Sequence, residues 1–165
     1  MGKSKLSVKN VHKTKKTVFV AAGIIAVVIT GFIFTKFNSK GNVQEDLIIL
    51  KSEISDNVKF YSYKSGKTNM EVMAVRASDG TIRTAFNTCQ ICYDSGRGYY
   101  MQEGDKLVCQ NCGNRFSLDQ LEKLKGGCNP VPITKEYKTE DDEVIVISQA
   151  FMDANKGLFG NWKKQ

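Results

Sequence analysis

The chain has 165 residues, 41% hydrophobic and 25% charged, a composition that excludes a disordered or collagen-like protein and allows one domain of ordinary size. The net charge is +7, but six lysines lie before residue 17, and the rest of the chain carries 18 basic and 17 acidic residues. The basicity therefore belongs to a tail rather than to a folded face, and nucleic-acid binding is not expected.

A stretch of 19 residues without charge, TVFVAAGIIAVVITGFIFT, follows this tail. At a rise of about 1.5 Å per residue, such a helix crosses the hydrocarbon part of a bilayer, and we predict a single transmembrane helix over residues 17–37. The lysines of residues 1–16 place the tail in the cytoplasm. The alternatives are a buried core helix, which would show a polar face, and a cleaved signal peptide, which would end in small residues rather than in GFIF.

Residues 38–44 are small and polar and are expected to form a linker to an extracytoplasmic domain at 45–165. Asp79-Gly80 lies between two runs of β-branched and aromatic residues and predicts a hairpin with a type I′ turn. The first strands of the domain are expected at 47–50, 58–63, 70–76 and 82–86.

A second hairpin is predicted from residues 98–102 and 106–109, which flank the turn sequence Glu-Gly-Asp. Ser117 is a candidate N-cap for a helix that ends at Gly126-Gly127, with Gln120 as its capping-box partner and leucines on one side. A strand at 143–148 and a short helix at 149–156 complete the chain. The fold class is therefore α+β and dominated by strands.

All five cysteines fall within 40 residues and form a C-x2-C-x16-C-x2-C pattern with one cysteine left over. Two C-x2-C pairs at this separation are typical of a four-thiolate metal site, in which each pair bends back toward one metal and a hairpin brings the pairs together. Gly113 follows the second pair, where a metal knuckle often needs a residue with positive φ. The candidate ligands are Cys89, Cys92, Cys109, Cys112 and Cys128.

Other thiol chemistry remains open for these cysteines. Outside the cytoplasm cysteines ordinarily form disulfides, and a C-x2-C disulfide would have redox character. A thioredoxin-like site needs a helix directly after the cysteine pair, and the residues that follow each pair do not predict one. His12, the only histidine, lies in the basic tail, so no histidine can complete a site in the domain. Disulfides, a redox dithiol and unliganded thiols are the alternatives to a metal.

The cysteines lie in an ordered set of motifs: FNTCQICY (86–93), GRGYY (96–100), LVCQNCGNRF (107–116) and GGCNPVPI (126–133). This set resembles the FtrD-like family of membrane iron-sulfur containing proteins over residues 58–148. The resemblance implies a membrane-anchored, extracytoplasmic domain that holds an iron-sulfur centre through the family's cysteines and serves an iron-uptake system built around an iron permease. Members often carry many membrane spans and only one is predicted here, so a transport role of its own is not expected.

Four thiolates suit either a redox-active iron-sulfur cluster or a structural zinc ion. We expect an electron carrier or metal-handling protein with no substrate turnover of its own, whose partner is an iron permease or another membrane transport or redox subunit. The alternatives are a zinc-binding interaction module of a membrane transporter complex and a thiol-disulfide oxidoreductase. Cys128, the extra cysteine, suggests ligand exchange, a second soft-metal contact or a resolving thiol; it could also pack as a small buried residue.

Several residues have structural explanations. Met70 and Met73 could offer sulfur to copper, but a methionine pair in a strand more often belongs to the core. The acidic run at 140–143 reads as a solvated turn rather than a cation site. Of Tyr99 and Tyr100, one is expected to pack beneath the cysteines.

Overall fold

The computed structural model describes residues 45–164, and the predicted tail (1–16), membrane helix (17–37) and linker (38–44) lie outside them. Among the described residues, no helix has the length and apolar character needed to cross a bilayer. One α-helix, α2 (Gln149–Asn155), lies in this part of the chain, together with single-turn 3-10 helices and ten strands. The strands are β1 (Leu47–Leu50), β2 (Lys59–Ser65), β3 (Thr68–Arg76), β4 (Ile82–Cys89), β5 (Tyr100–Glu103), β6 (Lys106–Cys109), β7 (Arg115–Ser117), β8 (Pro130–Pro132), β9 (Thr139–Glu140) and β10 (Val144–Ile147).

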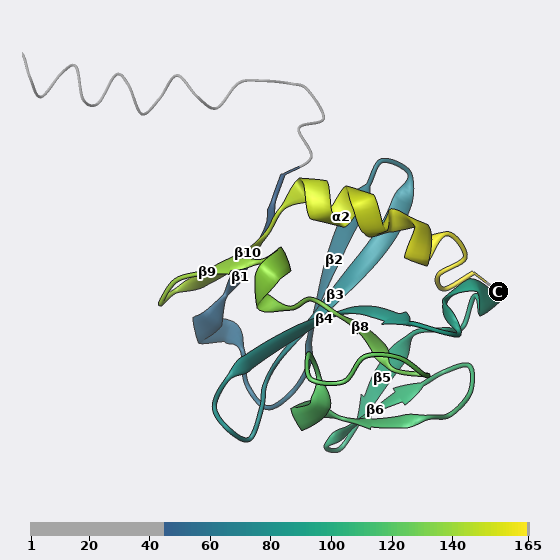
Figure 1. The fold of residues 1–165 in the computed structure, drawn as a ribbon, viewed down its shortest axis with the longest axis horizontal. Coiled ribbons are helices and arrows are strands. Elements are labelled where there is room, and N and C mark those ends of the chain that lie inside the picture. Colours follow the sequence, from purple (N-terminus) through teal and green to yellow (C-terminus); the bar gives the residue numbers. More distant parts are fainter. Residues whose placement is uncertain (1–44, 165) are drawn as a thin grey trace, which may run out of the picture. The chain divides into compact units, whose positions relative to one another are not determined.

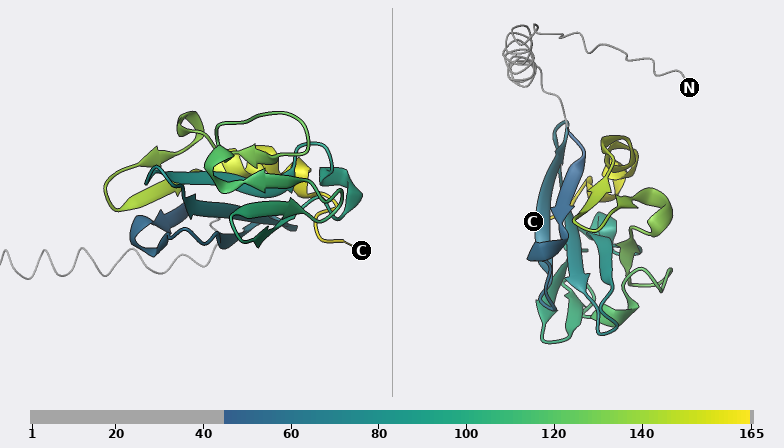
Figure 2. Two further views of the ribbon diagram at one scale, coloured as in Figure 1. Left: turned by 90° about the horizontal axis from the view of Figure 1, so that it is seen from below. Right: turned by 90° about the vertical axis from the view of Figure 1, so that its left-hand side faces the viewer.

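The strands form three antiparallel sheets, in the orders β1-β10-β9, β2-β3-β4-β8 and β5-β6-β7. The four-stranded sheet is central, and α2 and the β5–β6 hairpin lie toward opposite ends of the domain (Figure 1). Two further views show the same arrangement (Figure 2). Pairing of β1 with β10 joins the first strand of the described chain to its last, with Leu47 opposite Ile147. The expected strand-dominated α+β class is confirmed for these residues.

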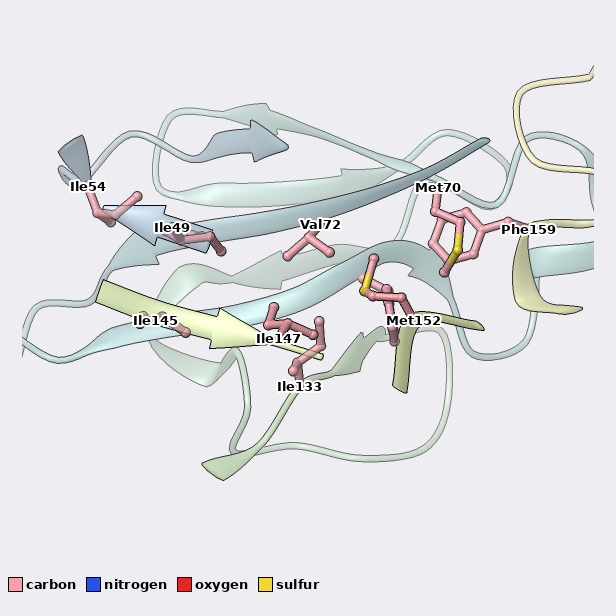
Figure 3. Close-up of a cluster of buried hydrophobic side chains, with 11 residues drawn as sticks. Ile49, Ile54, Met70, Val72, Ile133, Ile145, Ile147, Met152 and Phe159 are labelled. Atoms are coloured by element: carbon pink, nitrogen blue, oxygen red, sulfur yellow. The ribbon is translucent and has the colours of Figure 1, made fainter. Parts of the chain in front are cut away.

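Strand β3 is buried on both faces and separates two hydrophobic clusters. Met70, Val72 and Ala74 point into the first cluster, with β1, β10 and α2 (Figure 3). Met73 and Val75 point into the second, which contains Cys89, Cys92 and Cys109. Because side chains alternate along a strand, Met70 and Met73 lie on opposite faces. Both are core residues, as expected, and they do not form a copper site together.

The predicted strands and hairpins are present, with ends shifted by a few residues. The turn at Asp79-Gly80 differs from the prediction, because Gly80 has φ +79° and Asp79 does not have a positive φ. Ala77 accepts a hydrogen bond from the Gly80 amide at 2.9 Å and donates one to Thr81 O at 2.9 Å. This is a type I turn followed by a left-handed glycine, so the type I′ assignment was wrong although the hairpin is confirmed.

The prediction of a helix after Ser117 was wrong. Only a 3-10 turn forms, at Leu118–Gln120, and the Ser117 side chain makes no capping bond. Glu122 adopts a left-handed φ of +66°. From that position its carboxylate accepts hydrogen bonds from the Thr84 amide at 2.6 Å and from the Lys138 ammonium group. A buried ion pair between distant segments has therefore overridden local helix propensity.

Replacing Glu122 by alanine should destabilise the domain by about 3 kcal/mol or more, because Lys138 would keep a buried charge without a counter-charge. The Lys138 side chain is 1% exposed. Glu136→Ala is the matched control, since its pair with Lys125 is exposed and contributes under about 1 kcal/mol. Denaturant unfolding of the full chain in detergent, followed by fluorescence of the single tryptophan, Trp162, measures both. Equal midpoints for the two variants would contradict the prediction.

Candidate metal centre

The cysteines come from three separate segments that the fold brings together. Cys89 is the last residue of β4, and Cys92 lies in the turn that follows it. Cys109 is the last residue of β6, and Cys112 lies in the next turn. Cys128 lies in the loop that leads into β8. Two strand ends, the turn after each of them and one loop therefore supply the five thiols, as the spacing predicted for the two C-x2-C pairs.

The sulfur atoms form two overlapping triads. Those of Cys89, Cys92 and Cys109 lie within 4.8 Å of one another, and so do those of Cys92, Cys112 and Cys128. The Sγ atoms of Cys92 and Cys128 are 3.9 Å apart, and all five cysteines are free thiols. Cys92 belongs to both triads and joins them into one cluster, so the structure brings all five predicted residues together.

The cluster has a buried inner end and an accessible outer end. Cys89 and Cys109 are 0% and 1% exposed and belong to the second hydrophobic cluster. Cys128 is half-buried, and Cys112 is exposed. A small molecule or partner from solvent therefore meets Cys112 and Cys128 first.

Backbone amides point at the sulfur atoms. The Cys92 amide donates to Cys89 Sγ at 3.4 Å, and Cys109 Sγ accepts from the amides of Asn111 and Cys112. Gly113 has φ +72°, the positive φ expected after the second pair. This pattern at both C-x2-C turns stabilises thiolates, which are the form that binds metal.

The thiol pKa values reflect burial against these hydrogen bonds. Burial raises the pKa of Cys109 to about 12 although amides oppose it, and burial also raises the pKa of Cys92. At Cys89 burial acts in the same direction, but the Tyr100 hydroxyl and two amides outweigh it and lower the pKa. The Asn114 amide lowers the pKa of Cys112. A bound cation would favour ionisation of all of them together.

Tyr100 is the tyrosine that packs beneath the cysteines. It is 1% exposed, and its hydroxyl donates to the carbonyl oxygen of Cys128 at 2.8 Å. Asn87 holds its backbone, because the Asn87 Oδ1 accepts from the Tyr100 amide at 2.7 Å. Sequence analysis did not single out Asn87, since an asparagine inside a strand gives no signal of a buried partner.

Gly98 allows the first C-x2-C turn to lie against the segment that precedes β5. A Cβ at Gly98 would lie 2.1 Å from the Cys92 carbonyl oxygen. Its own carbonyl accepts from the Cys89 amide at 2.7 Å, and the next carbonyl, that of Tyr99, accepts from Gln110 at 2.8 Å. The GRG sequence was the available signal for this close approach, and only the fold shows its purpose.

No helix follows directly on Cys112: the turn leads into β7, and Cys92 is followed only by a 3-10 turn at Tyr93–Ser95. The helix dipole that activates a thioredoxin-like cysteine is therefore missing from both pairs in the described part of the chain.

The profile of the family described as membrane iron-sulfur containing protein FtrD-like matches residues 54–159. The chain belongs to this FtrD-like family. Among solved structures, the chain is similar to the quaternary ammonium Rieske monooxygenase CntA in complex with the inhibitor MMV12, with 19% identity and a TM-score of 0.42. That match covers 68% of this chain and 32% of the oxygenase, so the chain spans about a third of that protein's length. No curated protein matches.

The donor set of this FtrD-like domain fits the soft metal centre that the family name implies. It consists of thiols alone, and thiolates select zinc, copper(I) and iron-sulfur centres. Backbone amides point at the sulfurs of Cys89 and Cys109, and hydrogen bonds of this kind tune iron-sulfur centres. Arg97 and Arg115, which lie within the GRGYY and LVCQNCGNRF motifs, are exposed, and Arg115 pairs with Glu103 at 2.8 Å. The cluster could therefore hold a metal.

In metal-free protein, iodoacetamide should label Cys112 first, because its side chain is exposed and its pKa is lowered. Its labelling should also persist to lower pH than that of an ordinary cysteine, since the thiolate is the reacting form. Cys89 and Cys109 should stay unlabelled until urea unfolds the domain. Peptide mass spectrometry over a pH series measures the rates, and early labelling of Cys109 would contradict the prediction.

Gly98→Ala should displace the first C-x2-C turn, because the new Cβ would meet backbone atoms of Cys92. Cys89 should then become reactive toward iodoacetamide in the folded, metal-free protein. Gly157→Ala is the matched control, since nothing lies within 4 Å of a Cβ at that position. Unchanged protection of Cys89 in the Gly98 variant would show that the turn tolerates the methyl group.

Proposed function

We propose that the cysteine cluster holds a redox-active iron centre and that the protein serves a membrane iron-uptake system as an electron carrier or metal-handling subunit. One observation carries the proposal: in a member of a membrane iron-sulfur family, five thiols from three segments converge on one place. Cys89, Cys92, Cys109 and Cys112 are proposed as ligands, and Cys128 as the residue that modulates them.

When bound, such a centre would supply one-electron redox chemistry. The chain's own residues set the conditions for it. The buried pair Cys89 and Cys109 would hold the centre within an apolar surrounding, and the buried Tyr100 side chain packs against it in the same hydrophobic cluster. Cys112 lies at the accessible end. Electrons or a metal ion would therefore enter and leave on the side of Cys112.

The proposed topology follows from the sequence. The apolar segment at 17–37 would anchor the chain, the lysines of residues 1–16 would keep that end in the cytoplasm, and the described domain would lie outside. An anchored carrier of this kind needs a membrane partner close by. A permease or redox subunit for iron is the proposed partner, and as a carrier the protein would turn over no substrate of its own.

The test is elemental analysis with an optical spectrum on the full chain in detergent, purified anaerobically without a metal-affinity tag. Iron is expected, with a visible band that bleaches on reduction and returns on oxidation. Matching sulfide would indicate a cluster, and iron without sulfide a single ion. Cys109→Ser should lose the iron, whereas Met73→Leu, a neighbour in the same hydrophobic cluster, should keep it.

Two outcomes would contradict the proposal. Zinc alone, in a protein that shows no redox change, would favour the structural interaction module, since zinc closes with four thiolates and has no redox chemistry. Paired cysteines without any metal, and with insulin-reductase activity lost in Cys109→Ser, would favour a thiol-disulfide oxidoreductase.

A further inference from the structure

The cluster contains one thiol more than a four-coordinate metal can use. The surplus lies at the outer end, where Cys112 and Cys128 both belong to the triad of Cys92. The inner triad of Cys89, Cys92 and Cys109 is complete without either of them. Two thiols therefore lie at the end of the cluster where a fourth ligand would bind.

The position of Cys128 is set by the two C-x2-C turns themselves. Its carbonyl oxygen accepts from the Tyr100 hydroxyl and from Asn114 Nδ2, both at 2.8 Å. Asn114 belongs to the second turn. From the first turn, Gln90 accepts from the Gly126 amide at 2.9 Å through its side chain. These contacts bind the loop at its backbone and leave the Cys128 thiol to face the other sulfurs.

A second contact from Gln90 holds the far side of the same loop. The Gln90 amide donates to Asn129 O at 2.9 Å, and the Gln90 side chain donates to Pro130 O at 3.0 Å. One residue of the first C-x2-C turn, Gln90, thus forms hydrogen bonds with the loop on both sides of Cys128. A cysteine that merely filled space would need no such attachment, so its nearness to Cys92 is a built feature of the site.

Cys112 has more room than the inner cysteines. It is exposed, and no atom lies within 4 Å of a Cβ at the next residue, Gly113. The inner pair, by contrast, is fixed at the ends of β4 and β6. Exchange at the outer end would therefore leave the inner ligands in place.

We propose that Cys112 and Cys128 are alternative fourth ligands of one metal ion that Cys89, Cys92 and Cys109 hold. This inference rests on the proposed function, because it assumes that the cysteine cluster binds a metal. It does not require that the metal be iron. In each state one outer thiol binds and the other is free. A metal whose fourth ligand can be replaced from within the protein can be taken up or released one ligand at a time.

Cobalt(II) titration of the metal-free full chain in detergent tests the exchange. Wild type, Cys112→Ser and Cys128→Ser should each bind one cobalt with the charge-transfer intensity of four thiolates. The double variant should show the intensity of three thiolates. Its binding should be at least about tenfold weaker, because even loss of a partner behind a ligand costs that much. Cys109→Ser is the control for loss of an inner ligand. This single substitution should be enough to weaken cobalt binding and to lower the charge-transfer intensity.

Alkylation of cobalt-loaded wild type gives a second readout that does not depend on the stability of variants. Each molecule should take up one iodoacetamide label, shared between Cys112 and Cys128 across the population. Once one thiol is blocked, the other remains bound to the metal. A label on Cys128 alone, with a three-thiolate spectrum for Cys112→Ser, would overturn the inference and make Cys128 a bystander.

The two proposals fail in different ways. Cobalt spectra that follow the expected pattern in a protein that never carries iron would remove the iron function and keep the ligand exchange. A redox-active iron centre with Cys112 as the sole fourth ligand would do the reverse. Wild type that binds no cobalt through thiolates would overturn both.

Discussion

The site depends on a short backbone connection between the two C-x2-C turns. The carbonyls of Gly98 and Tyr99 accept hydrogen bonds from Cys89 and Gln110, so two adjacent residues bind one turn each. This connection aligns the end of β4, in one sheet, with the end of β6, in another. A Cβ at position 98 would lie 2.1 Å from the Cys92 carbonyl oxygen, so this close connection requires a glycine there.

Buried polar groups then fix the arrangement that this connection begins. Asn87 is 1% exposed, and its side chain forms hydrogen bonds with both the amide and the carbonyl oxygen of Tyr100. The backbone carbonyl oxygen of Asn87 accepts from Trp162 Nε1 at 2.7 Å. The pair of Lys138 and Glu122, which is hydrogen-bonded to Thr84 of β4, does the same at that strand. Such groups are costly unless their hydrogen bonds are made, so they favour one packing of the strands over its alternatives.

Local patterns predicted most of this domain, and tertiary contacts explain the exceptions. The strands at 47–50 and 70–76 and both hairpins follow from alternation and turn residues, and the cysteine spacing predicted the convergence of both pairs. The helix at Ser117 failed because the partners of Glu122 lie far away in sequence. The short strands β7, β8 and β9 carry two or three residues each, too few for a pattern, and the attachment of Cys128 depends on Gln90 and Asn114, whose role no local signal marks.

The same contacts make the two ends of the cysteine cluster different. At the inner end, strand ends and apolar neighbours leave Cys89 and Cys109 little freedom, and burial raises the cost of an uncompensated thiolate there. At the outer end, Cys112 and Cys128 lie on turns and reach solvent. Metal binding would therefore stabilise the inner end most, because it supplies the charge that burial otherwise opposes. Exchange belongs at the outer end, where a thiol can leave the metal without leaving a charge in the core.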